Sequence, residues 1–147
     1  MATLYIVATP IGNLEDITLR ALRVLAEVDV IFCEDTRTTR VLLERYKIKT
    51  ATESFHAKSP LSKIDHIIEL LQSGKNLALV SDAGTPCISD PGMLLVAEVR
   101  KQSPDTSMAA IPGASALTAA ISIAGKPLHE FVFLGFLPHK KGRKTLF

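Results

Sequence analysis

The sequence predicts an α/β fold with a doubly wound parallel sheet, and two observations carry this prediction. Apolar runs of strand length alternate with segments of helical periodicity along residues 1–125. One of these runs, LALV at residues 77–80, is unbroken, as is typical of a strand buried on both faces of a parallel sheet. Strands separated by helices favour right-handed crossovers, so helices should cover both faces of the sheet.

The first three strands are expected at residues 4–8, 28–33 and 51–55. Asp16 is predicted to cap the first helix, whose apolar stripe ends at Val28. Thr36 is predicted to cap the second helix, over residues 37–46.

The second half of the chain repeats this pattern around the strand at residues 77–80. Two helix starts combine a capping residue with proline, Ser59-Pro60 and Asp90-Pro91. These helices should end near Gly74 and Gln102. A fifth strand is expected at residues 107–111, followed by a helix that starts at Ser115 and ends at Gly125.

Composition limits the classes of protein. The chain has 147 residues, of which 47% are hydrophobic, enough for the core of one typical domain. A formal charge of +2 does not by itself indicate a nucleic-acid partner. Cys33 and Cys87 fit neither a disulfide framework nor a zinc site, so we expect a reducing cytoplasm. Because the sequence lacks a basic leader and a long apolar run, we expect a soluble protein that does not associate with membranes. The positions of its histidines suggest no metal site.

Three glycine-containing loops follow predicted strands, at residues 9–16, 81–92 and 111–116. Because the carboxyl ends of parallel strands meet at one edge of a sheet, these loops predict a single ligand-binding edge. The loop at residues 81–92 is the strongest signal, since ordinary connections of this kind run about two to six residues. Neither a GxGxxG motif nor a P-loop is present, which disfavours a phosphate-anchored nucleotide cofactor.

The same loops carry a family resemblance. In chain order the motifs are TPIGNLEDIT at residues 9–18, EDTR at 34–37, SDAGTPCISDPG at 81–92, PGASA at 112–116 and GFLP at 135–138. Through them the chain resembles the tetrapyrrole methylase superfamily of S-adenosylmethionine-dependent methyltransferases. Its first loop, which replaces the usual GxGPGD, resembles the branch that methylates the ribose 2′-hydroxyl of a cytidine in 16S rRNA. Ala114 stands where this branch commonly has proline.

The resemblance implies two domains with S-adenosylmethionine in the cleft between them. Residues 1–125 would be the cofactor-binding domain, and residues 126–147 a linker and the start of a second domain that is mostly missing, beginning with a strand at 131–134. By the same resemblance the cofactor would contact Pro10, Asp82, Ala83, Gly84, Thr85, Pro86, Ile88 and Ser115. For Asp82 the alternative is an Asx turn that only shapes the loop.

Methyl transfer to a ribose hydroxyl calls for a general base, because that hydroxyl is a poor nucleophile at neutral pH. Glu34 and Asp35 are the candidates for this base or for positioning the substrate, with His56 as a further candidate. Alternatively, Glu34 and Asp35 belong to a helix start in which Arg37 pairs with one of them, and His56 is a polar surface residue.

Substrate contacts are expected from Arg37 and from a cationic run that contains Lys140, Lys141 and Arg143, because rRNA phosphates are bound mainly by such side chains. A solvated helix end is the alternative for that run. We also expect a homodimer in which residues 131–137 are covered. The leading function is a cytoplasmic methyltransferase acting on 16S rRNA of the small subunit, with the fragment's own activity open. The alternatives are a methylase of a porphyrin-like small molecule and a truncated module that binds cofactor or RNA without turnover.

Overall fold

A five-stranded parallel sheet forms the centre of the computed structural model, which describes residues 2–127 and 129–136. The strands lie in the order β3-β2-β4-β1-β5, and every neighbouring pair is parallel. Their bounds are β1 Thr3–Val7, β2 Val30–Cys33, β3 Ala51–Ser54, β4 Leu77–Val80 and β5 Ser107–Ile111. The predicted α/β class with a parallel sheet is therefore confirmed.

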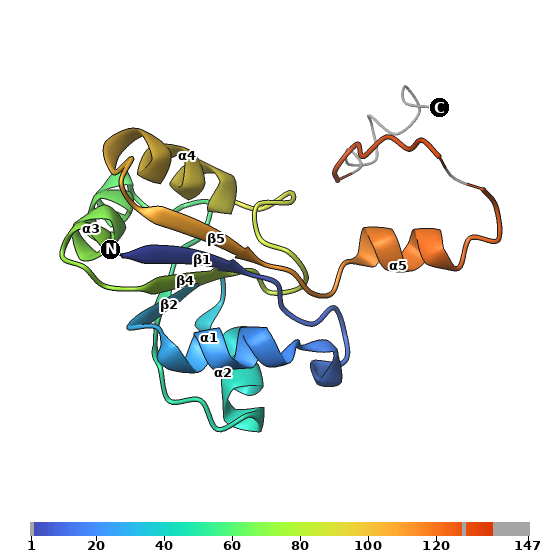
Figure 1. Cartoon of the computed structure of the whole chain (residues 1–147), viewed down its shortest axis with the longest axis horizontal. Coiled ribbons are helices and arrows are strands. Elements are labelled where there is room, and N and C mark those ends of the chain that lie inside the picture. The colour runs from blue at the N-terminus through green and yellow to red at the C-terminus, as the bar shows by residue number, and fades with distance from the viewer. Residues whose placement is uncertain (1, 128, 137–147) are drawn as a thin grey trace.

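Helices cover both faces of this sheet. They are α1 Leu19–Glu27, α2 Thr36–Arg45, α3 Leu61–Gln72, α4 Gly92–Gln102 and α5 Ala116–Ser122, with a 3₁₀ turn η1 at Leu14–Asp16. Figure 1 shows α1 and α2 on one face and α3 and α4 on the other. Two separate apolar clusters match these two layers, one built with α1 and α2 and the other with α3 and α4.

Strand β4 shows why its sequence is apolar throughout. Successive strand residues point to opposite faces of a sheet. Ala78 and Val80 accordingly join the cluster under α1 and α2, whereas Leu77 and Leu79 join the cluster under α3 and α4. All four side chains are at most 2% exposed, so β4 is the buried central strand that its sequence predicts.

Two predicted N-cap residues are wrong, each by one or two positions in the sequence. Asp16 does not cap α1; it lies in η1, and the Thr18 hydroxyl accepts the hydrogen bond from the backbone N–H of Ala21 instead. Similarly, Asp35 rather than Thr36 is the N-cap of α2. In both cases another short polar residue lies nearby in the sequence, and local pattern alone does not rank such competing acceptors.

The two starts that contain proline also differ from expectation. Ser59 does not cap α3; its hydroxyl accepts a hydrogen bond from the backbone N–H of His56, and Pro60 occupies the N-cap position. At α4 the carboxylate of Asp90 accepts a hydrogen bond from the N–H of Gly92 at 2.8 Å, as a capping residue would, although the helix begins only at Gly92.

Helix α5 projects away from the sheet, beyond the carboxyl ends of the strands (Figure 1). It ends at Ser122, earlier than the predicted Gly125, and has no buried residue. Residues 129–136 then form neither helix nor strand, so the strand expected at residues 131–134 is absent from the structure. Of the helices in the described part of the chain, none combines the length and the apolar character needed to cross a membrane.

Candidate functional site

The first loop and the long loop are fastened together at the carboxyl edge of the sheet. Thr9 and Gly84 exchange two backbone hydrogen bonds, with N···O distances of 2.9 and 3.0 Å. The buried Thr9 hydroxyl donates to the carbonyl oxygen of Ser81 at 3.0 Å, and the Ser81 hydroxyl donates to the carbonyl oxygen of Gly84 at 3.1 Å. These bonds hold the start of the loop at residues 81–92 against the loop that follows β1.

One cavity lies on the α2 side of this junction, and we call it the α2 cavity. It encloses about 320 Å³. Its lining residues come from the loop after β1, from α2 and from the loop after β4: Thr9, Pro10, Ile11, Gly12, Leu14, Thr38, Thr39, Leu42, Ser81, Asp82 and Ala83.

A second cavity, the α5 cavity, lies on the other side of the junction and encloses about 410 Å³. It is lined by the long loop, the start of α5 and the segment that follows it: Ile11, Ala83, Gly84, Thr85, Ile88, Ser89, Ser115, Ala116, Leu117, Phe133, Gly135 and Phe136. Ile11 and Ala83 line both cavities, so they form the wall between them.

The residues predicted to bind the cofactor are divided between the two cavities. Pro10 and Asp82 line the α2 cavity, and Ala83 lines both. The α5 cavity is lined by Gly84, Thr85, Ile88 and Ser115. Pro86 lines neither of the two. The expected single ligand edge thus contains two adjoining compartments.

The long loop has a strained backbone. Cys87 and Ser89 have φ angles of 69° and 64°, in the left-handed region that glycine tolerates and other residues rarely adopt. Such conformations cost about 1–3 kcal/mol each and are often found at ligand-binding sites. Burial raises the pKa of the Cys87 thiol to about 11, so this thiol is protonated near neutral pH.

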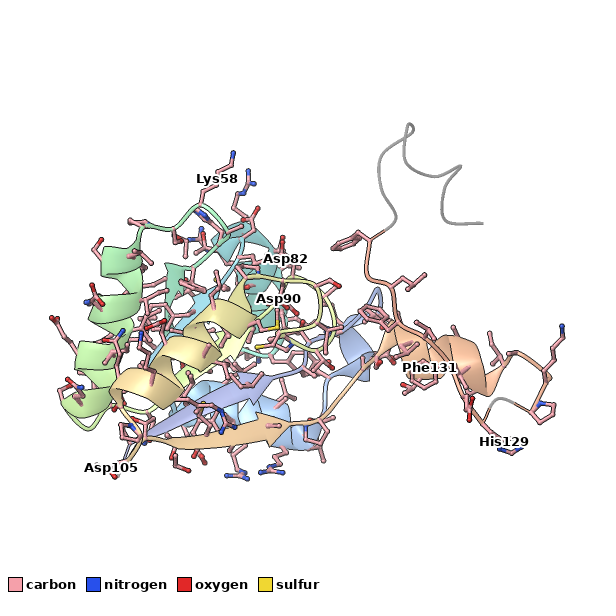
Figure 2. The ribbon with its side chains drawn as sticks, turned by 90° about the horizontal axis from the view of Figure 1, so that it is seen from above. Lys58, Asp82, Asp90, Asp105, His129 and Phe131 are labelled. Carbon is pink, nitrogen blue, oxygen red and sulfur yellow. The ribbon has the colours of Figure 1, made fainter. Side chains whose placement is uncertain are left out.

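Carboxylates from two loops influence one another at this edge. The pKa of Glu34 is raised, first by burial and then by the negative charges of Asp82 and Asp90, while His56 lowers it. Figure 2 labels Asp82 and Asp90 on the loop that joins β4 to α4. Glu34 therefore holds a proton more readily than an ordinary glutamate does.

Asp35 has a different environment. Its carboxylate accepts a hydrogen bond from the backbone N–H of Arg37 at 2.8 Å and pairs with the Arg37 guanidinium, with an Nη2···Oδ2 distance of 2.6 Å. The side-chain hydrogen bond from Arg37 is the largest cause that lowers the pKa of Asp35 to about 2. This is the helix-start arrangement, so the geometry favours that alternative for Asp35 and weakens it as a base.

Asp82 connects two of these loops. Its Oδ1 accepts a hydrogen bond from the backbone N–H of Asp35 at 3.1 Å. The side chain therefore ties the loop after β4 to the loop after β2, which carries Glu34. This contact joins neighbouring strands and is not the local Asx turn considered as the alternative.

The remaining candidates are peripheral or lie elsewhere. His56 is exposed, and its Nδ1 accepts a hydrogen bond from the backbone N–H of Lys58, which fits a polar surface residue. Lys140, Lys141 and Arg143 fall outside the described residues. Within residues 2–127 and 129–136, no group of three or more His, Cys, Asp or Glu side chains could hold a metal ion.

Sequence reasoning missed the contribution of α2 to the site. Thr38, Thr39 and Leu42 line the α2 cavity from one side of the helix. Thr39 and Leu42 have the spacing of an ordinary buried stripe, and Thr38 is exposed beside them, so the pattern does not distinguish a packed core from a cavity wall. Phe133 and Phe136 were also missed as lining residues, because residues 131–134 were expected to form a strand and residues 131–137 to be covered in a homodimer.

Comparison with known proteins gives close relatives over nearly the whole chain. The chain is 51% identical to the ribosomal RNA small subunit methyltransferase I of Thermotoga maritima, over 99% of this chain and 65% of that protein. It is 50% identical to proteins of the same name from Mycoplasmopsis pulmonis and Mesorhizobium japonicum, over 98% and 96% of this chain. The chain spans 64% and 47% of the lengths of these two proteins.

Solved structures share the fold at low sequence identity. Uroporphyrin-III-C-methyltransferase from Thermus thermophilus aligns with a TM-score of 0.63 at 23% identity, covering 88% of this chain and 55% of that one. Diphthine synthase aligns with a TM-score of 0.66 at 17% identity, covering 85% and 49%. The family model described as tetrapyrrole (corrin/porphyrin) methylases matches residues 3–146. The chain therefore belongs to the tetrapyrrole methylase family.

Proposed function

We propose that this chain binds S-adenosylmethionine and is part of an enzyme that methylates small-subunit ribosomal RNA. The names and the roughly 50% identity of the three relatives support the substrate class. In this proposal residues 1–125 form the cofactor-binding domain, and residues 126–147 begin a second domain, in agreement with the greater length of those relatives. The finer assignment is the ribose 2′-hydroxyl of a cytidine in 16S rRNA, in the cytoplasm.

The α5 cavity is the observation that carries the cofactor proposal. Among the residues that the structure describes, its lining contains no charged side chain and combines backbone amides, the hydroxyls of Thr85 and Ser115, and aromatic rings. Phe133 and Phe136 offer faces on which an adenine can stack or beside which a sulfonium is attracted. Such walls suit the adenine and the sulfonium of S-adenosylmethionine, and the hydroxyls and backbone amides offer partners for its amino and carboxyl groups.

When bound, S-adenosylmethionine supplies an electrophilic methyl group. On this proposal Ala83, Gly84, Thr85, Ile88 and Ser115 hold the cofactor in the α5 cavity, and Pro10, Asp82 and Pro86 support it from the rest of the loop junction. Asp82 adds a negative charge beside the wall, which offsets the positive sulfur.

Glu34 is the proposed general base. With the cofactor bound, the Glu34 carboxylate would take the proton of the ribose hydroxyl that accepts the methyl group. Its raised pKa brings its basicity closer to neutral pH, where general bases work best. Asp35 is less suitable because its pairing with Arg37 stabilises the carboxylate, which leaves it little tendency to take up a proton.

The experiment compares methyl transfer with cofactor binding. The chain, with and without Glu34→Gln, is supplied with radiolabelled S-adenosylmethionine and 30S subunits, and binding is measured by calorimetry. We expect Glu34→Gln to bind the cofactor normally and to lower transfer at least 100-fold, within the range for general-base catalysis. Glu44→Gln, an exposed change on α2, is the control.

Three other outcomes would contradict parts of this proposal. Methylation of a porphyrin-like acceptor in place of 30S subunits would contradict the substrate class. Cofactor binding without any transfer would favour a binding module. Absence of cofactor binding would refute the proposal as a whole.

A homodimer is the proposed assembly. Phe131, Val132, Phe133, Leu134 and Phe136 are between 53% and 85% exposed, and contiguous exposed apolar side chains commonly mark an interface. Closed two-fold association is the commonest arrangement for soluble homo-oligomers. Light scattering should give twice the chain mass, and Phe136→Lys should lower it. A monomer at micromolar concentration would contradict this assembly.

A further inference from the structure

The α2 cavity has the size and position of a second ligand site. Its volume of about 320 Å³ lies near the lower end of the range of about 300–1,000 Å³ typical of small-molecule sites. It is separated from the proposed cofactor cavity only by the wall that contains Ile11 and Ala83. Two ligands, one in each cavity, would therefore lie on opposite sides of this wall, which we call the partition.

The lining of the α2 cavity suits a nucleoside. Pro10, Ile11, Leu14 and Leu42 provide apolar surface for the faces of a base. Thr38, Ser81 and Asp82 provide hydroxyl and carboxylate groups for its polar edges and for the ribose. No lysine or arginine is among the described lining residues, so the wall fits an uncharged nucleoside rather than a phosphate.

The proposed base, Glu34, lies on a loop that is hydrogen-bonded to the lining of this cavity rather than to that of the α5 cavity. Asp82, a lining residue, accepts a hydrogen bond from the backbone N–H of Asp35, the residue after Glu34. Its negative charge also reaches Glu34. In the described part of the chain, no residue that lines only the α5 cavity makes a hydrogen bond to that loop. A general base must lie within hydrogen-bond reach of the hydroxyl that it deprotonates.

Arg37 can serve the phosphates that flank such a nucleoside. It precedes the lining residue Thr38 at the start of α2. Although paired with Asp35, its side chain is 88% exposed and keeps other N–H groups available. A guanidinium outside a cavity whose described lining holds no cation matches an RNA strand whose phosphates stay in solvent while one nucleoside turns inward.

We propose that the α2 cavity binds the acceptor nucleoside of a single RNA strand, turned out of its stack, with its ribose hydroxyl at the rim of the partition, where the two cavities adjoin beside Ile11 and Ala83 and the hydroxyl would face the methyl group of the cofactor directly. This inference rests on the proposed function and deepens it by locating the acceptor. It also places Pro10 and Asp82 on the acceptor side of the partition. Enzymes that modify a nucleotide commonly extrude it from the stack in this way.

The test fills the α2 cavity from its rim. Thr38 is exposed on α2, so Thr38→Trp should keep the helix while its indole enters the cavity. Val41→Trp is the matched control, because Val41 is exposed on the same helix and lines neither cavity. Calorimetry with S-adenosylmethionine and fluorescence anisotropy with a labelled single-stranded RNA that contains cytidine are measured on the full chain. We expect Thr38→Trp to weaken RNA binding at least tenfold and to leave cofactor affinity within twofold, while Val41→Trp changes neither.

A measurement on the unsubstituted chain makes the test independent of any folding defect. RNA that carries 4-thiouridine is crosslinked to the chain, and the crosslinked peptides are mapped. Crosslinks at residues 9–14 or 38–42 are expected. Three results would each overturn the inference while leaving cofactor binding by the unsubstituted chain intact as a finding. The crosslinks could be confined to other segments, or the chain could bind the cofactor but not RNA. The third result is a Thr38→Trp chain that loses the cofactor but keeps RNA. Failure of the unsubstituted chain to bind S-adenosylmethionine would instead contradict the proposed function.

Discussion

The Thr9 hydroxyl is expected to hold the partition between the two cavities in place, and Thr9→Val tests this with little change in side-chain volume. The hydroxyl donates to the carbonyl oxygen of Ser81 at 3.0 Å and to that of Gly84 at 3.4 Å. The carbonyl of Gly84 keeps other donors, namely the backbone N–H of Thr9 and the Ser81 hydroxyl. The loss therefore falls mainly on Ser81.

The magnitude follows from one buried hydrogen bond. Leaving a buried carbonyl without its partner costs about 1–3 kcal/mol of the free energy of unfolding. For a chain of this size, each kcal/mol lowers Tm by about 2–4 °C. Because the partition also shapes the cofactor cavity, we expect S-adenosylmethionine to bind about tenfold more weakly, which corresponds to about 1.4 kcal/mol.

Thr50→Val separates the stability effect from the binding effect. The Thr50 hydroxyl also donates to a backbone carbonyl, that of Leu25 at 2.7 Å, but it lies next to the amino end of β3, at the opposite edge of the sheet. Thermal unfolding and calorimetry are measured for both variants. Both should lose stability, and only Thr9→Val should lose cofactor affinity. Equal cofactor affinity in the two variants would refute the role assigned to Thr9.

Three further predictions concern the long loop and the start of α2. Gly84→Val should abolish cofactor binding and keep the circular dichroism of the fold, because φ is +81° and the added Cβ meets Ile11 at 3.4 Å; a lost fold would make Gly84 structural. Arg37→Ala should raise the pKa of Asp35 from about 2 toward about 3.9, seen by carboxyl NMR. An Asp35 titration midpoint that is unchanged in Arg37→Ala would contradict the pairing. In the unsubstituted chain the contribution of this pair to stability is present above about pH 3.9 and is lost as pH falls through 2. Cys87, with a pKa of about 11, should react with iodoacetamide at pH 7.5 more slowly than in the urea-unfolded chain, and equal rates would argue against its burial.

The strands and most helices could be predicted from sequence because their signals are local. The unbroken apolar run of β4 and the inward stripe of α3 each identify one element without reference to the rest of the chain. The order β3-β2-β4-β1-β5 could not be predicted, because pairing depends on contacts between distant segments. The start of α1 was misplaced because Asp16 and Thr18 are both suitable caps and only the η1 turn decides between them.

The candidate site could be predicted as an edge but not as two compartments. Each loop was identified from its glycine and proline residues. The division into two cavities arises from the Thr9–Gly84 bridge, which joins residues far apart in the sequence. The role of Asp35 was likewise left open, because a capping carboxylate and a catalytic carboxylate have the same sequence signature. Only the bond to Arg37 favours the first.

The central claim is that the α5 cavity holds S-adenosylmethionine. Titration of the uniformly ¹⁵N-labelled chain with this cofactor tests it directly, through the amide chemical shifts. The account predicts that the largest shift changes fall on Gly84, Thr85, Ser115 and Ala116, which line that cavity. Changes that spare these amides and concentrate instead around Gly74, which lines a cavity at the opposite edge of the sheet, would contradict it.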